Sequence, residues 1–194
     1  MKSSPPYELC TYTVLPPELV KPLHDLDTIC FRRNYVQTSA DHKDQDDKYC
    51  SGADRICYVL ALKHTDVIGE TRVFKRTIEF NHQNVVLGGI GSVGTHPDNR
   101  QKGIASMMIQ KAMEILRQNS CDVVYLCTDT YNKKLVGLYE QFGFRLLDKP
   151  HTYVGESGKR YTDIDGMIAP VCSQKLFQTI VESPLPVDIG VGNW

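Results

Sequence analysis

The spacing of apolar and polar residues predicts an alternation of strands and helices along the chain. Apolar positions recur at helical spacing over 18–31 and 104–118, and the second segment carries an inward stripe. The members of that stripe are Ile104, Met107, Met108, Ala112, Ile115 and Leu116. Between the two helices lie β-type runs at 55–64, 67–78 and 85–95, separated by short turn sequences. Short connections predict that these three strands form an antiparallel meander.

The remaining elements extend this pattern to a single α/β (α+β) domain over residues 1–194. The chain opens with a strand at 7–15, and after 118 the pattern predicts a strand, a helix and two more strands, at 123–128, 133–142, 144–147 and 160–171. A strand–helix–strand order from 85 to 128 is typical of parallel neighbours joined by a crossover helix. We therefore expect a mixed, mostly antiparallel sheet with one parallel strand pair, flanked by helices.

Composition and charge narrow the function classes. The formal net charge is −1, from 22 basic and 23 acidic residues, which gives no basic footprint for nucleic acid. Apolar runs stay below the roughly 18 residues that a membrane span needs, and the first residues lack the apolar core of a secretory signal. The 7 Cys contain no CxxC pair, and no His stands at metal-ligand spacing. We expect free thiols, a cytoplasmic location, no metal and no membrane or nucleic-acid partner.

The most informative motif lies at 91–106, where a strand stops at a turn and a helix begins. A helix N-terminus attracts anions through its unpaired N–H groups and its partial positive charge. Gly103 and Ala105 let an anion approach the backbone, and Arg100, Lys102 and Ser106 add charge and a hydroxyl. The segment is neither a Gly-x-Gly-x-x-Gly nor a Walker loop, which argues against a nucleotide site. The residue types suit a pyrophosphate.

Two motifs together resemble the GNAT superfamily of acetyl-CoA-dependent N-acetyltransferases. Arg100-Gln101-Lys102-Gly103-Ile104-Ala105 matches the family's pyrophosphate signature, Arg/Gln-x-x-Gly-x-Gly/Ala. Asn132 and the block from Leu138-Tyr139 to Gly143-Phe144 match a second family motif after strand 123–128. The resemblance implies the GNAT fold, in which the parallel strands matching 85–95 and 123–128 splay apart. It also implies acetyl-CoA as co-substrate.

The resemblance assigns roles to individual residues. The pyrophosphate would contact the loop and helix start, at Arg100, Gln101, Lys102, Gly103, Ile104, Ala105 and Ser106. The main chain at Val93 and Thr95 would contact the thioester arm, and Asn132 the pantetheine. Tyr139 would be the general acid that protonates the departing thiolate.

The general base is less defined by the sequence. The family often carries a Glu in the strand before the loop, whereas here that strand reads Leu87-Gly-Gly-Ile-Gly-Ser-Val93 with no acid. Glu70 on the neighbouring strand, or a chain of waters, is the expected base. Asp98 and Asp129 are alternatives, although turn positions suit both of them as structural residues.

An acidic loop indicates the acceptor. Asp41, Asp44, Asp46 and Asp47 cluster there, which is typical either of a solvated face or of a rim that attracts a polycationic amine. The chain also resembles the aminoglycoside 2'-N-acetyltransferases. The positions that carry this resemblance are Asp41, Asp46, Thr130, Asp163 and Trp194.

That narrower resemblance implies that these five residues bind substrate and that the tail, 184–194, folds back so that its carboxylate reaches the site. The sequence departs from that family at Gly91, where its strand Glu would stand, and at Gln101, where it has Gly. The leading expectation is an acetyltransferase for a small polycationic amine such as an aminoglycoside antibiotic, which would make the protein a resistance enzyme. An acetyltransferase of a peptide or protein amine and a CoA-binding module without turnover are the alternatives. A homodimer is expected by analogy with such folds.

Overall fold

The computed structural model describes residues 7–31, 47–49 and 52–194. Asp41, Asp44 and Asp46 lie outside these described residues. The elements of the first half are β1 (Glu8–Tyr12), α1 (Pro17–Phe31), β2 (Arg55–Lys63), β3 (Asp66–Phe80), β4 (Gln83–Thr95), the short 3-10 turn η1 (Pro97–Asn99) and α3 (Ile104–Gln118). Those of the second half are β5 (Val123–Cys127), α4 (Lys133–Glu140), β6 (Arg145–Leu146), β7 (His151–Val154), β8 (Arg160–Asp163), β9 (Gly166–Pro170), α5 (Gln174–Glu182) and β10 (Val187–Val191).

A seven-stranded sheet forms the centre of the molecule, in the order β1-β2-β3-β4-β5-β9-β6. The strands from β1 to β4 run antiparallel to their neighbours, and β4 and β5 are parallel. Strand β9 is antiparallel to both β5 and β6. The predicted mixed sheet with a parallel pair is therefore confirmed.

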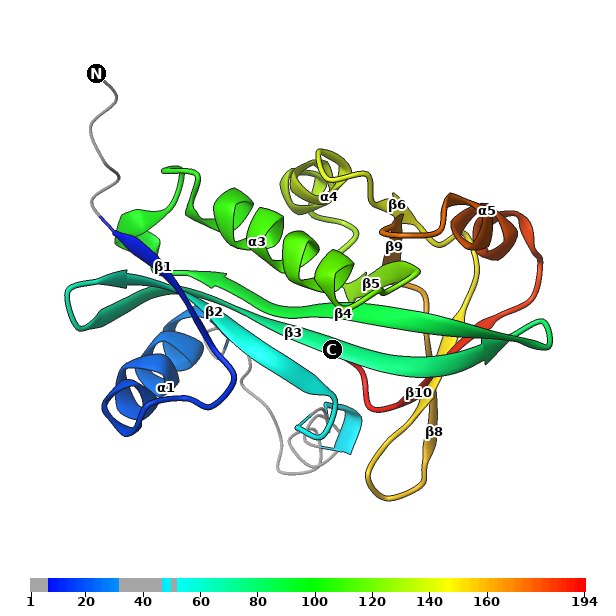
Figure 1. Ribbon diagram of the computed structural model, residues 1–194, viewed down its shortest axis with the longest axis horizontal. Helices are drawn as coiled ribbons and strands as arrows, with labels where there is room; N and C mark the ends of the chain where they lie inside the picture. The colour runs from blue at the N-terminus through cyan, green and yellow to red at the C-terminus, as the bar shows by residue number, and fades with distance from the viewer. Residues whose placement is uncertain (1–6, 32–46, 50–51) are drawn as a thin grey trace.

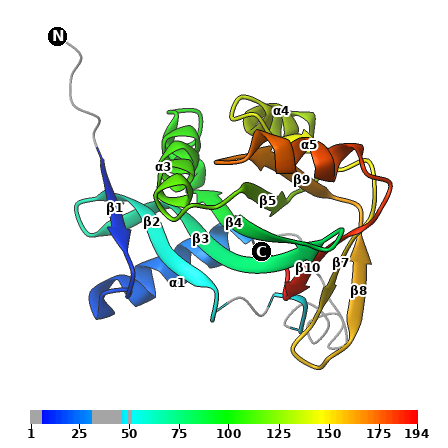
Figure 2. The same ribbon diagram turned by 45° about the vertical axis from the view of Figure 1, so that its right-hand side comes forward.

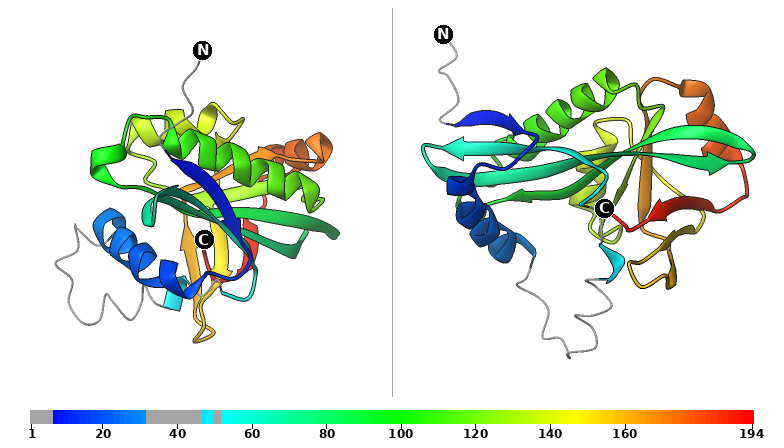
Figure 3. Two further views of the ribbon diagram at one scale, coloured as in Figure 1. Left: turned by 60° about the vertical axis from the view of Figure 1, so that its left-hand side comes forward. Right: turned by 60° about the horizontal axis from the view of Figure 1, so that its bottom comes forward.

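Helices cover both faces of this sheet, as Figures 1 and 2 show. Helices α3 and α4 lie on one face and α1 on the other, and the views of Figure 3 agree. Helix α3 approaches β3 closely, because a Cβ at Gly69 would stand 2.9 Å from the Ile104 side chain. The predicted inward stripe of α3 is buried except at Met107, which is 39% exposed while Met108 faces the core.

A second sheet of three strands, in the order β10-β7-β8, stands beside the main one. Strand β10 runs parallel to β7, and β7 is antiparallel to β8. Figure 2 shows this small sheet next to the end of β3 and β4, on the face that carries α1. It encloses an apolar core with the main sheet, which includes Phe74, Tyr125, Tyr153 and Trp194.

The predicted single strand at 160–171 is corrected to two strands, β8 and β9, in different sheets. The chain crosses between the sheets at Ile164, which is 70% exposed, and Asp165. The first strand is shorter than predicted and ends at Tyr12. Strands β7 and β10 and helix α5 were not predicted. In the described part of the chain, no helix is long and apolar enough to cross a membrane.

Candidate active site

The site begins where β4 and β5 separate. They pair only from Leu87 opposite Val123 to Gly89 opposite Tyr125, although β4 continues to Thr95 and β5 to Cys127. Beyond that point the main-chain groups of β4 on this side have no partner in the described β4–β5 ladder. The two strands thus leave a notch, as the resemblance implied.

A β-bulge in β4 lies beside this notch. Glu70 and Arg72 are two residues apart on β3, whereas their partners Gly94 and Gly91 are three apart on β4. Ser92 takes up the extra residue with a left-handed φ of 51°. In the described pairing, neither Ser92 nor Val93 has a β3 partner, so the main-chain groups of Val93 could bond a ligand.

The loop before α3 leaves that helix uncapped. Gly103 stands at the N-cap position with a φ of 78° and gives no side-chain cap, so the first N–H groups of α3 are available to an anion. The Arg100 Nε donates to the Thr95 carbonyl at 3.1 Å, and the Lys102 Nζ donates to the Asp98 carbonyl at 2.8 Å. These contacts keep two cations beside the helix start. The predicted helix bounds, 104–118, are confirmed.

Tyr139 lies on α4, next to the end of β5. Its ring is 5% exposed and meets the Phe144 ring edge to face, with centroids 5.9 Å apart. Its hydroxyl forms a hydrogen bond with the Thr128 side chain, and burial raises the pKa of Tyr139 to about 12. The hydroxyl is therefore protonated at neutral pH and can donate a proton. Thr130, two residues after Thr128, is half-buried.

Asn132 caps the N-terminus of α4. Its side-chain oxygen accepts hydrogen bonds from the N–H groups of Lys134 and Leu135, at 3.2 and 3.4 Å. Only the amide nitrogen of Asn132 could therefore bond a cofactor. The resemblance assigned it a contact with pantetheine, which stays a prediction.

Glu70 is fully buried on the face of β3 that carries α1. Its Oε2 accepts a hydrogen bond from Arg72 at 3.1 Å, and the same guanidinium pairs with Asp27 at 2.6 Å. Burial, together with a hydrogen bond to Asp27, raises the pKa of Glu70 to about 9 although Arg72 opposes the shift. A carboxyl that is protonated at neutral pH cannot take a proton, so this environment favours a structural role for Glu70.

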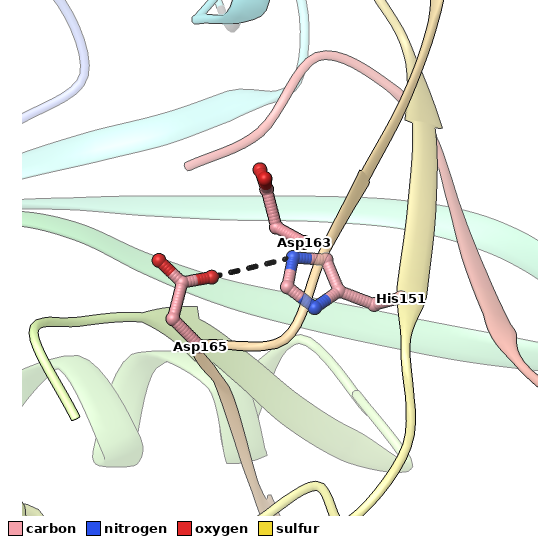
Figure 4. Close-up of side chains that lie close together, drawn as sticks. All are labelled: His151, Asp163 and Asp165. Atoms are coloured by element: carbon pink, nitrogen blue, oxygen red, sulfur yellow. Dashed lines mark ion pairs between the residues drawn. The ribbon is translucent and has the colours of Figure 1, made fainter.

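The acid-rich turn between β8 and β9 contributes to a cluster of polar side chains on the α1 face. His151, Asp163 and Asp165 meet there, with Nε2 of His151 3.8 Å from Oδ1 of Asp165 (Figure 4). One ligand atom from each lies within 4.8 Å of the others, the spacing of a possible metal site, which the sequence did not indicate. One oxygen of Asp163 already accepts the Tyr153 hydroxyl and one of Asp165 accepts the Cys127 thiol. We therefore interpret the cluster as polar side chains held by their neighbours in the fold rather than as a metal centre.

The tail reaches the middle of the same face, where Figures 1 and 2 mark the last residue. The carbonyl groups of Ile189 and Gly192 accept hydrogen bonds from the Arg76 guanidinium, which also covers the Trp194 ring at 4.0 Å. A Cβ built on Gly91 would stand 3.0 Å from the main-chain carbon of Trp194. Trp194 thus lies where the resemblance would have placed a strand carboxylate.

Asp47 is the one residue of the acidic cluster that the structure describes, and it binds the small sheet. Its carboxylate accepts hydrogen bonds from the Tyr161 hydroxyl and the Ser157 N–H, both at 2.6 Å. These bonds, that of Tyr161 first, lower the pKa of Asp47. Asp47 is thus engaged in the fold.

Sequence reasoning missed three residues of the site: His151, Asp165 and Cys127. Asp165 stands only two residues after Asp163, which the sequence analysis did single out. His151 and Cys127 carried no local signal, because a partner far along the chain gives each its place.

A parallel strand pair that separates beside an uncapped helix, with a buried tyrosine near the end of β5, is the arrangement of an acyl-CoA-dependent acyltransferase that the resemblance implied. Comparison with known families agrees with this class. The model described as "Acetyltransferase (GNAT) family" matches residues 20–144, which is more than half of the chain. The chain therefore belongs to the GNAT acetyltransferase family, and it carries an acyltransferase domain of the N-acetyltransferase type.

Individual relatives are more distant. The chain is 28% identical over 97 residues to N-alpha-acetyltransferase 30 of Saccharomyces cerevisiae, a match that covers 50% of this chain and 55% of that protein. The chain thus spans about half the length of this curated relative.

Among solved structures, the ribosomal-protein-S18-alanine N-acetyltransferase of Escherichia coli has a TM-score of 0.55 at 10% identity, over 84% of this chain and 94% of that one. A chain of the NatC complex bound to Gag peptide and CoA has a TM-score of 0.54 at 16% identity, over 84% and 98% of the two chains. At these identities the likeness confirms the fold.

Proposed function

We propose that this protein transfers an acetyl group from acetyl-CoA to a primary amine of a cationic acceptor, by direct attack of the amine on the thioester. The observation that carries the proposal is the β4–β5 notch, which opens between the uncapped start of α3 and the hydroxyl of Tyr139. Pyrophosphate binding, stabilisation of the thioester oxygen and protonation of the thiolate each have a candidate residue beside this notch.

The pyrophosphate of acetyl-CoA fits the start of α3. Gly103 has no Cβ, its left-handed φ turns the chain into the helix, and the N–H groups of Ile104, Ala105 and Ser106 follow it. Arg100 and Lys102 add positive charge at the same end, and both are exposed. Gln101, with a φ of 61°, completes the loop.

The reacting groups sit at the notch itself. In this proposal the main-chain N–H of Val93, in the bulge, donates a hydrogen bond to the thioester carbonyl oxygen as negative charge develops there. The amine attacks the carbonyl carbon, the C–N bond forms and the C–S bond breaks. Tyr139 gives its proton to the thiolate, as its burial and position favour. Thr95 borders the same notch and holds Arg100 through its carbonyl.

A small polycationic amine, of which aminoglycosides are examples, is the first acceptor candidate. The support is the carboxylate of Asp163, 27% exposed beside Asp165, which is 39% exposed, because both would attract an ammonium group. Trp194 would form the wall of this acceptor site, and Thr130 would border it. Asp41 and Asp46 stay predictions from the sequence.

A peptide α-amine is the second candidate. The observation that favours it is the identity shared with N-alpha-acetyltransferase 30. A peptide α-amine carries fewer positive charges than a polyamine. The acidic residues should therefore contribute less to binding a peptide acceptor than to binding a polyamine.

Thiol release from acetyl-CoA tests the function. Protein and acetyl-CoA would be incubated with an aminoglycoside, a linear polyamine and short peptides of different N-terminal residue, and the free thiol measured against time. Release with the aminoglycoside or the polyamine supports the first candidate, and release with peptides alone supports the second. No release with any amine, together with thermal stabilisation by CoA, would indicate a CoA-binding module without turnover. A homodimer stays a separate prediction, which sedimentation tests.

A further inference from the structure

His151 is an unusual buried residue. Its side chain is 0% exposed, and within the described part of the structure neither ring nitrogen has a hydrogen-bond partner. Oδ1 of Asp165 lies 3.8 Å from Nε2 of His151, and this oxygen is also buried and accepts no hydrogen bond from the described residues. Burying polar atoms without partners is costly, so such an arrangement calls for a functional explanation.

Asp165 connects this pair to the reaction centre. Its main-chain carbonyl accepts a hydrogen bond from the Thr128 N–H at 3.1 Å, and its Oδ2 accepts one from the Cys127 thiol at 3.1 Å. The side chain of Thr128 also bonds the hydroxyl of Tyr139. Asp165 and Tyr139 therefore both form hydrogen bonds with Thr128, which directly follows β5, and the Asp165 side chain is 39% exposed.

We propose that Asp165 is the general base that takes the proton of the acceptor's ammonium group, and that His151 is the positioning residue that receives this proton from Asp165. The inference rests on the proposed function. It assigns the general base, which β4 cannot provide because Gly91 stands where the family often carries a Glu. Figure 4 shows the two side chains facing each other, from β7 and from the crossing between β8 and β9.

The proton balance closes with these groups. The ammonium gives one proton to Asp165, and the freed electron pair forms the C–N bond as the C–S bond breaks. The thiolate takes the Tyr139 proton, and the tyrosinate recovers one from the nitrogen that becomes the amide. Asp165 passes its proton to His151 and from there to solvent, so each turnover releases one proton.

The charges around His151 suit this task. The carboxylates of Asp163 and Asp165 face it, and the rings of Tyr125 and Tyr153 pack on it with centroids 5.2 and 6.1 Å away. Lys48 pairs with Asp163 at 3.8 Å, and the Cys127 thiol donates to Asp165. Burial lowers the pKa of His151, against the two carboxylates, so the imidazole is neutral at pH 7 and can accept a proton.

The variants Asp165→Asn and His151→Asn test the inference in the full chain. Acetyl transfer would be measured from pH 6 to 10 with two amines, one of high pKa and one that is already neutral at pH 7. We expect Asp165→Asn to lower kcat for the high-pKa amine by about 10²-fold or more at pH 7, with recovery as the pH approaches the amine's pKa. The loss should be much smaller for the neutral amine. His151→Asn should move the acidic limb of the pH profile upward, with a smaller effect on maximal kcat.

Matched control variants replace an aspartate and a histidine that lie outside the proposed site. Asp148→Asn changes an exposed acid three residues before His151, and His82→Asn changes an exposed turn histidine with a φ of 60° that Asn tolerates. Both should keep kcat within about twofold of wild type. Thermal stabilisation by CoA, unchanged in all variants, would show that the fold and the cofactor site are intact. Should Asp165→Asn not fold, Asp165→Glu keeps a carboxylate and should retain the pH profile at reduced kcat.

Several results would overturn the inference. An equal loss for both amines at every pH would give Asp165 a structural role, and full activity of Asp165→Asn would exclude it as the base. Loss of wild-type activity on chelation, restored by Zn²⁺, would make the cluster a metal site instead. If wild-type protein released no thiol with any amine, the proposed function would fail, and this inference with it.

Discussion

The indole ring of Trp194 stacks on the phenyl ring of Phe74, with centroids 5.4 Å apart and planes 6° from parallel. The indole also fills the space above β4, where a Cβ at Gly89 would lie 2.0 Å from the ring. The glycines of β4 and the packing of the tail therefore depend on each other. This relationship explains why the strand that borders the notch carries no side chain on this face at Gly89 and Gly91.

A first prediction follows for Gly89→Ala. The added methyl group would overlap the indole, so we expect the free energy of unfolding to fall by about 1–3 kcal/mol, as for overpacked cores. Urea denaturation would measure it. In a Trp194→Ala background the same substitution should cost much less, and equal costs in both backgrounds would contradict the contact. Gly137→Ala is the control, because it lies in α4 with open space around its Cβ and should stabilise the helix by up to about 1 kcal/mol.

A second prediction concerns Tyr139→Phe. The ring and its packing against Phe144 remain, whereas the proton donor is lost, so we expect kcat to fall by about 10²- to 10⁴-fold with CoA affinity unchanged. Steady-state kinetics with an amine acceptor would measure the change. Tyr12→Phe, on the edge strand β1, is the control and should leave kcat unchanged. A fall in CoA affinity with kcat preserved would instead make Tyr139 a binding residue.

A third prediction separates backbone strain from anion binding at Gly103. Its φ of 78° is unfavourable for other residues, and a Cβ there would meet no atom within 4 Å. Gly103→Ala should therefore lower stability by about 1–2 kcal/mol and also weaken CoA binding, which calorimetry would measure. Gly158→Ala has the same left-handed strain, with a φ of 83°, in a turn of the small sheet. It should cost similar stability while CoA affinity stays at the wild-type value.

A fourth prediction uses the raised pKa of Glu70. In the folded protein the Glu70 carboxyl keeps its proton up to about pH 9, while in the unfolded chain it releases the proton near its ordinary pKa of 4.5. This group therefore contributes stability that is present below pH 4.5 and is lost as the pH rises toward 9. Glu70→Gln lacks the ionisation, so its stability relative to wild type should increase from pH 5 to 9. Urea midpoints at three pH values would measure this, and parallel pH curves for the two proteins would refute the shift.

The elements with strong local patterns were predictable. Helix α3 has apolar residues at every inward turn and a glycine at its start, and its bounds were predicted to the residue. The meander β2-β3-β4 follows from alternating runs with short turns, because such strands can only pair with their neighbours in sequence. The loop motif and the Tyr139 block identified the family for the same reason, since both are contiguous.

The small sheet and the polar cluster beside it were not predictable in the same way. Strand β10 pairs with β7, more than thirty residues earlier in the sequence, and neither has enough alternation to be recognised alone. The run 160–171 has continuous β propensity, so its division between two sheets depends on which partners compete for each half. The surroundings of His151 on β7 are formed by Tyr125 on β5 and by Asp165 at the crossing between β8 and β9, so they arise only when these distant segments come together.

The sequence by itself determined the class of this protein: the strand–turn–helix motif at 91–106, the block at Tyr139 and the order of the elements. These are local features, in which neighbours in sequence are neighbours in space. The tertiary structure decided how the polar groups on the α1 face are arranged, namely a buried Glu70 held by Arg72, the main chain of Trp194 against Gly91, and Asp165 facing His151. Burial and contacts between distant segments set the protonation states and the positions of these side chains. No single segment of the chain contains that information.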